Sequence, residues 1–160
     1  MLFLTIISVA SCLVLSSTSI LMKGDEDSAR DSALSYARAC LDSLLASTLE
    51  EAFYEGGDGG RVLLGNNTTI EDFLLAETYL VSQGMPVDAF ADGNGRIEMI
   101  ARALLTGAYY YSIETKVAGD RGFESVFSLG IPGPSSGYSA SSDYSVGGES
   151  IRIELVLHWA

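Results

Sequence analysis

The sequence predicts an α+β protein. A long apolar N-terminal helix is continued by an amphipathic helix, and a small C-terminal head of short helices and an antiparallel β-sheet follows. Three observations support this class. Residues 1–22 contain no charged side chain. The next stretch repeats its apolar residues at helical spacing, and the last third of the chain alternates with the period of a strand. We therefore divide the chain into an apolar segment, residues 1–24, and an acidic part, residues 25–160.

The apolar segment reads MLFLTIISVASCLVLSSTSILM over residues 1–22. As a helix it would span roughly 33 Å, about the thickness of the hydrocarbon core of a bilayer. A cleavable signal peptide should start with a positively charged region, and none precedes this run. Two interpretations stay open. The segment is a membrane anchor, or it is the N-terminus left after removal of a short basic leader.

Small side chains recur at regular spacing in the apolar segment. Ser8, Cys12 and Ser16 are four residues apart, and Ser19 follows three residues later. On a helix this spacing gathers them on one face, where a neighbouring helix can approach closely. We expect this face to mediate helix–helix packing between copies of the chain. The alternative is a membrane span whose hydroxyl groups bond back to their own helix.

A second, amphipathic helix is expected over residues 25–54. Asp25 opens a run of three acidic residues after Gly24, and acidic residues favour the first turn of a helix because they face its positive dipole end. Residues 55–60 are rich in glycine and should end it. Its apolar stripe consists of Ala33, Ala37, Leu41, Leu44, Leu45, Thr48, Ala52 and Phe53.

Two short helices are expected in the head. The first is expected over residues 70–83, because Thr68 and Glu71 have the spacing of a capping box at its start and Gly84 marks its end. A weaker helical pattern covers residues 96–105.

Strands follow these helices. Alternation predicts strands over residues 109–117 and 123–129, and the Gly-, Ser- and Pro-rich residues 131–150 should form a loop. In the final strand we expect His158 to lie on the outward face. The core-facing residues of that strand should be Ile151, Ile153, Leu155, Leu157 and Trp159.

The charge of the chain argues against a nucleic-acid partner. The net charge is −12, with nine Lys and Arg against 21 Asp and Glu. Phosphate backbones are bound by clustered basic residues, which this chain lacks, so we expect no nucleic-acid partner.

The two cysteines, Cys12 and Cys40, would be roughly 40 Å apart along helices, too far to pair within one chain. We interpret both as small packing residues.

No motif predicts catalysis, and we expect neither a cofactor nor a metal. Asp92-Gly93-Asn94-Gly95 resembles the middle of a calcium loop. However, the first and twelfth positions would be Phe90 and Ala101, where carboxylates are needed. We interpret the motif as a Gly-rich turn that starts a helix.

Two overlapping N-glycosylation sequons occur at Asn66 and Asn67, next to a Gly-rich stretch where the chain should be accessible.

The arrangement of an apolar N-terminal helix, a polar amphipathic helix and a β-containing head resembles the type IV filament superfamily. Bacterial pilins carry a glutamate at position 5, where this chain has Thr5, so the resemblance is to archaeal type IV pilins. It implies a leader cut by a dedicated peptidase, helices bundled into a filament core, and frequent glycosylation.

The expected function is therefore that of a structural subunit of an extracellular helical filament, used for adhesion. The subunit should be membrane-inserted before assembly and form a homopolymer, with an unknown surface or cell receptor. The alternative is a single-pass membrane-anchored extracytoplasmic binding domain, or a minor pilin of an assembly or secretion machine. An enzyme ranks third.

Overall fold

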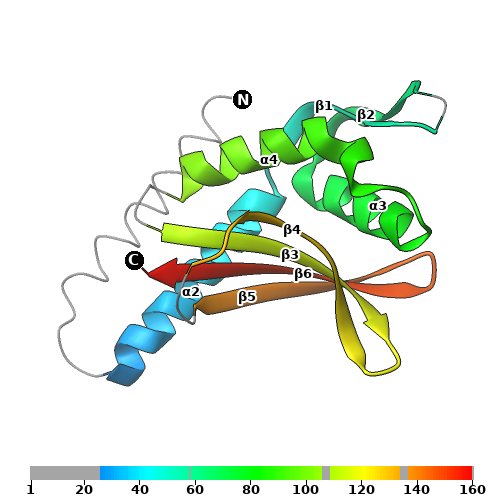
Figure 1. The fold of residues 1–160 in the computed structure, drawn as a ribbon. Coiled ribbons are helices and arrows are strands. Elements are labelled where there is room, and N and C mark those ends of the chain that lie inside the picture. Colours follow the sequence, from blue (N-terminus) through cyan, green and yellow to red (C-terminus); the bar gives the residue numbers. More distant parts are fainter. Residues whose placement is uncertain (1–25, 58, 106–108, 134–136, 160) are drawn as a thin grey trace.

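The computed structural model describes residues 26–57, 59–105, 109–133 and 137–159 (Figure 1). Three α-helices, one short 3-10 helix and six strands make up the described part of the chain. In order, these elements are α2 (Glu26–Leu45), β1 (Thr48–Glu55), β2 (Arg61–Thr69), α3 (Ile70–Ser82), η1 (Val87–Phe90), α4 (Ala91–Leu104), β3 (Tyr109–Gly119), β4 (Gly122–Ile131), β5 (Tyr138–Val146) and β6 (Glu149–Trp159).

The strands form two antiparallel sheets. β1 and β2 make a two-stranded hairpin, and the other four strands pair in the order β4-β3-β6-β5. The three α-helices gather on one face of the larger sheet, with α2 running against β5 and β6 (Figure 1). The opposite face carries mostly polar residues. One apolar and one polar face is the usual pattern of an antiparallel sheet that meets water on one side.

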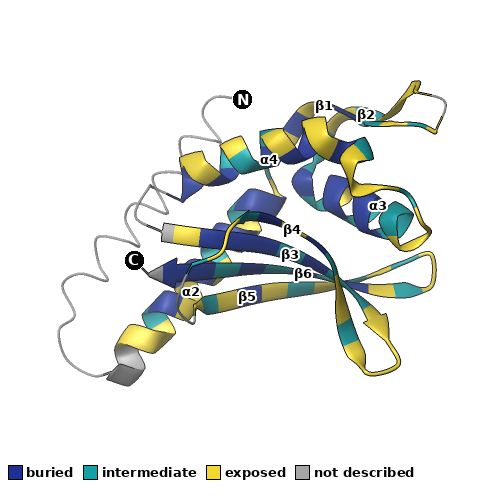
Figure 2. Ribbon diagram, viewed as in Figure 1, coloured by how far each residue is buried: buried dark blue, intermediate teal, exposed yellow. Residues whose placement is uncertain are grey.

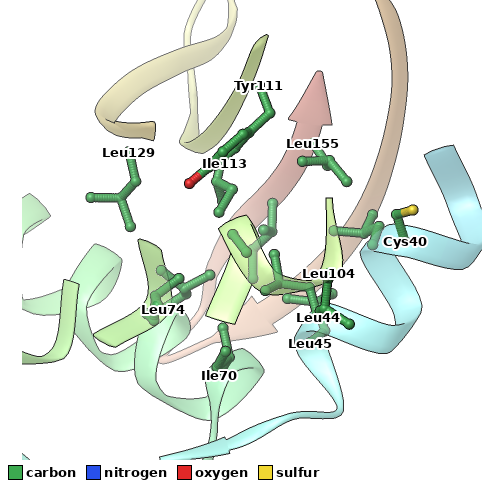
Figure 3. Packing of buried hydrophobic residues seen from close by; sticks show 14 of the residues in the cluster. Cys40, Leu44, Leu45, Ile70, Leu74, Leu104, Tyr111, Ile113, Leu129 and Leu155 are labelled. Atoms are coloured by element: carbon green, nitrogen blue, oxygen red, sulfur yellow. The ribbon is translucent and has the colours of Figure 1, made fainter. Parts of the chain in front are cut away.

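The core lies between the large sheet and the helices (Figures 2 and 3). β6 is central, and its register sets Leu155 opposite Ile113 of β3 and Ala140 of β5. The predicted inward face of this strand is confirmed, except for Trp159, whose side chain lies outside the described part. The strand pairs antiparallel with β3. At most 1% of the surface of each inward residue is exposed: Ile151, Ile153, Leu155 and Leu157.

The prediction of a long apolar N-terminal helix continued by an amphipathic helix to residue 54 is wrong. The described part of the chain contains no such helix. Its first helix, α2, ends at Leu45, and residues 48–55 form β1. In β1, Ala52 and Phe53 are buried in succession, and Leu49 is buried three residues before Ala52. This spacing departs from strict alternation and matches a helical stripe, which explains the error.

Residues 1–25 lie outside the described part of the chain. The proposed packing residues Ser8, Cys12, Ser16 and Ser19 and the boundary between residues 24 and 25 belong to this region. Among the helices that are described, none has the length and apolarity needed to cross a bilayer. Cys40, by contrast, is a buried core residue, as expected.

The helices of the head were predicted with small errors. α3 occupies the expected residues, but its N-cap is Thr69 rather than Thr68. The Thr69 hydroxyl accepts a hydrogen bond of 3.0 Å from the Asp72 amide and donates one of 2.7 Å to its carboxylate. α4 begins at Ala91, so the Asp92–Gly95 motif forms its first turns instead of a preceding loop.

The expected loop at residues 131–150 contains a strand, β5, at the edge of the sheet. Its residues alternate toward the helices as Tyr138, Ala140, Ser142 and Tyr144, opposite the inward residues of β6. Small and polar side chains serve here because α2 lies directly over the strand. The sequence therefore shows no apolar alternation, and pairing with β6 decides the conformation.

His158 is buried, with 9% of its surface exposed, although we expected it on the outward face. The register does place it away from the inward residues of β6, beside Tyr110. However, the segment after β4 folds over this end of the sheet. A Cβ atom at Gly133 would collide with His158 and also approach Tyr110. The alternation correctly predicts that His158 points away from the core. It does not show that the segment around Gly133 covers this end of the polar face.

Candidate functional site

A groove of about 390 Å³ lies between the end of α2, the start of α3 and β5. It is lined mainly by charged and hydroxyl-bearing side chains. The lining residues are Arg38, Asp42, Leu45, Ala46, Thr69, Glu71, Asp72, Ser142 and Tyr144.

The charged groups of the groove are largely engaged within the fold. Arg38 donates a hydrogen bond of 2.7 Å to the Ser141 carbonyl and forms an ion pair of 3.1 Å with Asp42. The guanidinium thus ties α2 to the outer edge of β5. Burial is the main influence that raises the pKa of Tyr144, and the charge of Glu71 adds to it. The groove holds carboxylates, a phenol and hydroxyls, but no paired nucleophile and base.

The open face of the large sheet carries two ionic clusters. Lys116 lies 2.6 Å from Glu154 and 2.9 Å from Glu114, and the hydrogen bond to Glu154 is the largest influence raising the pKa of Lys116. Arg152 binds both carboxylate oxygens of Asp143, at 2.7 and 2.8 Å. These cross-strand pairs tie the strands together and leave the two cations neutralised by the protein itself.

Arg152 also stacks on an aromatic ring. Its guanidinium carbon lies 4.1 Å from the centre of the Phe123 ring, on the far side of β3. Strict alternation along this strand would place Phe123 on the same face as Phe127 and Leu129. The register shift after Thr115 turns it to the open face, because a bulge inserts one residue into β4.

Both sequon asparagines are exposed and lie on β2. Asn67 has a φ of 58°, in the left-handed region that asparagine tolerates better than most residues. The hydroxyl of the Asn67 sequon belongs to Thr69 and is occupied by the α3 cap. The hydroxyl of the Asn66 sequon belongs to Thr68, which is not the cap. The hydroxyl of the Asn66 sequon is therefore not used by the α3 cap, whereas that of the Asn67 sequon is.

The residues of the calcium-like motif do not converge. Asp92 is exposed and pairs with Arg96 at 2.9 Å, one turn further along α4. Asn94 is buried and donates a hydrogen bond to Glu77 at 2.7 Å. Helical geometry directs the two side chains away from each other. Nowhere in the described residues do three or more His, Cys, Asp or Glu side chains gather as a metal site.

The contact between Glu77 and Asn94 escaped the sequence analysis. Glu77 occupies a core position of α3, seven residues after buried Ile70 and three after buried Leu74. None of its surface is exposed. An acidic residue within an otherwise apolar helical stripe is the signal that could have revealed it, because carboxylates are almost never fully buried without a partner.

Comparison of the chain with protein-family models, with curated proteins and with solved structures finds no match.

Proposed function

We propose that this chain is the structural subunit of an extracellular helical filament of the type IV pilus kind, joined to its neighbours through the apolar N-terminal segment. The observation that carries the proposal is the division of the chain into an uncharged apolar segment and an acidic remainder. Residues 1–22 have no charge, and the rest of the chain carries the entire net charge of −12. An apolar segment of this length must be buried somewhere.

The head has a hydrophobic core, whose buried cluster is built from side chains between Tyr36 and Leu157. The inward residues of β6 are at most 1% exposed, as are Leu41 of α2 and Ile97 of α4. In this proposal the apolar segment is buried in a bilayer before assembly and against other copies of the chain after it.

The acidic surface of the head suits such an assembly. Like-charged heads repel one another and stay soluble, while the uncharged segments associate. Adhesion is the use we assign to the filament. The groove between α2, α3 and β5 supports a second candidate, a membrane-anchored extracytoplasmic binding module.

Removing detergent from the purified full chain should give filaments visible by negative-stain electron microscopy. Ser16→Phe should block them, because it adds bulk to the proposed packing face, whereas Leu13→Phe, off that face, should assemble like the wild type. Circular dichroism checks that the head is folded in all three proteins. A wild-type chain that enters vesicles as a monomer and never polymerises would contradict the filament and favour the anchored module.

We expect a glycan at Asn66 or Asn67 in the native source, since both side chains are exposed. Intact mass of the natural subunit measures it, and a mass equal to the bare chain would refute the expectation. Asn67→Gln keeps the Asn66 sequon, and Thr68→Ala keeps only the Asn67 sequon. Because Thr69 is held by the helix cap, the glycan should persist in Asn67→Gln and be lost in Thr68→Ala.

A further inference from the structure

Two polar side chains occupy core positions on facing helices. Glu77 lies on the buried face of α3 and is fully buried; Asn94 lies on the buried face of α4 and is 8% exposed. The Phe73 ring, one turn before Glu77, packs against Gly93, the neighbour of Asn94. The two side chains therefore meet in a buried environment at the contact between α3 and α4.

The hydrogen bonds of this pair are incomplete for an ionised carboxylate. The Asn94 amide nitrogen donates to Glu77 Oε1 at 2.7 Å. The remaining oxygens, Glu77 Oε2 and Asn94 Oδ1, are both buried and have no hydrogen-bond partner among the described residues. Each can only accept if Glu77 is charged. Rotating the amide would bring two acceptors together at the short contact, so it does not solve the problem.

One proton completes both bonds. A protonated carboxyl carries an O–H on Oε2, which can donate to Asn94 Oδ1 while Oε1 accepts from the amide nitrogen. Both orphaned atoms are then satisfied by a cyclic pair of hydrogen bonds. A buried polar group without a partner is costly and a buried unpaired charge more so, which favours this neutral form.

We propose that Glu77 is a neutral carboxylic acid in the folded head and forms, with Asn94, a proton-dependent latch between α3 and α4. Loss of the proton leaves a buried charge and two unsatisfied acceptors at this contact, so alkaline conditions weaken the packing of the two helices.

The charged groups around the latch do not compensate Glu77. Among the ion pairs of the described residues, none includes it. On α4, Asp92 and Arg96 pair with each other. Also on α4, Glu98 pairs with Arg102. Charged groups on the other elements packed against α3 are exposed, lie on the open face of the sheet, or are bonded elsewhere. They include Asp88, Glu50, Glu51, Glu55, Arg61, Glu114, Lys116, Glu124, Glu149, Arg152, Glu154, Arg38 and Asp42, and the Tyr111 hydroxyl donates to the Glu98 carbonyl.

Burial raises the pKa of Glu77 to about 8, from an ordinary value of 4.5, and the hydrogen bond from Asn94 opposes the rise. Because the folded pKa is above the unfolded one, the stabilisation is complete below about pH 4.5 and is lost as the pH rises to about 8.

Glu77→Gln tests the latch, because glutamine can form the same cyclic pair without a titratable proton. The unfolding equilibrium constant of the full chain is measured by urea denaturation from pH 5 to 8. Relative to the variant, the wild-type constant should rise about tenfold per pH unit between pH 5 and 7.5. Glu124→Gln, at an exposed position on β4, should show the wild-type pH dependence.

A second measurement tests the proposal even if Glu77→Gln does not fold. In carbon-detected NMR of the wild-type chain with labelled glutamate, the side-chain carboxyl of Glu77 should titrate near pH 8. A wild-type spectrum in which every glutamate titrates below about pH 6 overturns the proposal, as does a ratio of unfolding constants that is flat with pH.

Discussion

Leu155→Asp is expected to unfold the head. Leu155 is fully buried at the centre of β6, between Ile113 of β3 and Ala140 of β5. Removing the leucine side chain gives up about 1.5–3 kcal/mol of burial. The new carboxylate would also be buried without a partner. Losses above about 4–5 kcal/mol are typical of such changes, and a small domain has about 5–15 kcal/mol in total.

Circular dichroism and limited proteolysis of the full chain measure this effect. Ser145→Asp supplies the matched control. It adds the same carboxylate to the neighbouring strand β5, at an exposed position opposite Ser150, and should leave the head folded. If Leu155→Asp melted like the wild type, the inward face of β6 would be assigned wrongly.

Gly93→Ala should destabilise the head by about 1–3 kcal/mol, against the usual trend. Alanine in place of glycine within a helix normally stabilises it by about 1 kcal/mol. A Cβ atom at residue 93, however, would lie less than 3.0 Å from three ring atoms of Phe73. That ring is fully buried, so it cannot move aside without disturbing the core. The cost of overpacking then exceeds the gain in helix propensity.

Gly95→Ala, two residues later on α4, should have the opposite sign. Apart from its chain neighbours and the backbone of α4, no described atom lies within 4 Å of its Cβ position, and the residue is exposed. Its expected gain is about 0.5–1 kcal/mol from helix propensity alone. Urea denaturation of the two variants beside the wild type measures both changes. Equal stabilisation by both would show that Phe73 does not pack on Gly93.

The Leu155→Asp prediction bears on the proposed filament as well. A head that unfolds exposes the subunit to proteolysis, so Leu155→Asp should lower filament yield through loss of protein. Ser16→Phe should lower it with the head intact. Measuring the amount of folded subunit beside the filament yield separates the two causes.

The α+β class and much of the large sheet could be predicted from the sequence. Large apolar side chains alternate with polar ones from Ile151 to Leu157, and only a strand puts them on one face. The helix at Ile70–Ser82 was likewise predictable, because its stripe is long enough to show the period. Local spacing alone carries this information.

Other parts depended on tertiary contacts. Leu49, Ala52 and Phe53 are buried in β1, so the apolar residues of this strand have the spacing of a helix. The inward residues of β5 under α2 are small or polar, so the strand shows no apolar alternation. His158 lies on the polar face as its position predicts but is covered by the segment around Gly133. In each case the deciding neighbour is distant in the sequence.

The same division holds for the function. The sequence by itself determined that an uncharged segment is joined to an acidic head, because composition along the chain is a local property. Only the tertiary structure paired Glu77 with Asn94, which lie 17 residues apart on different helices. Hydrogen bonding and burial depend on what surrounds a side chain, and the order of residues does not contain those surroundings until the chain has folded.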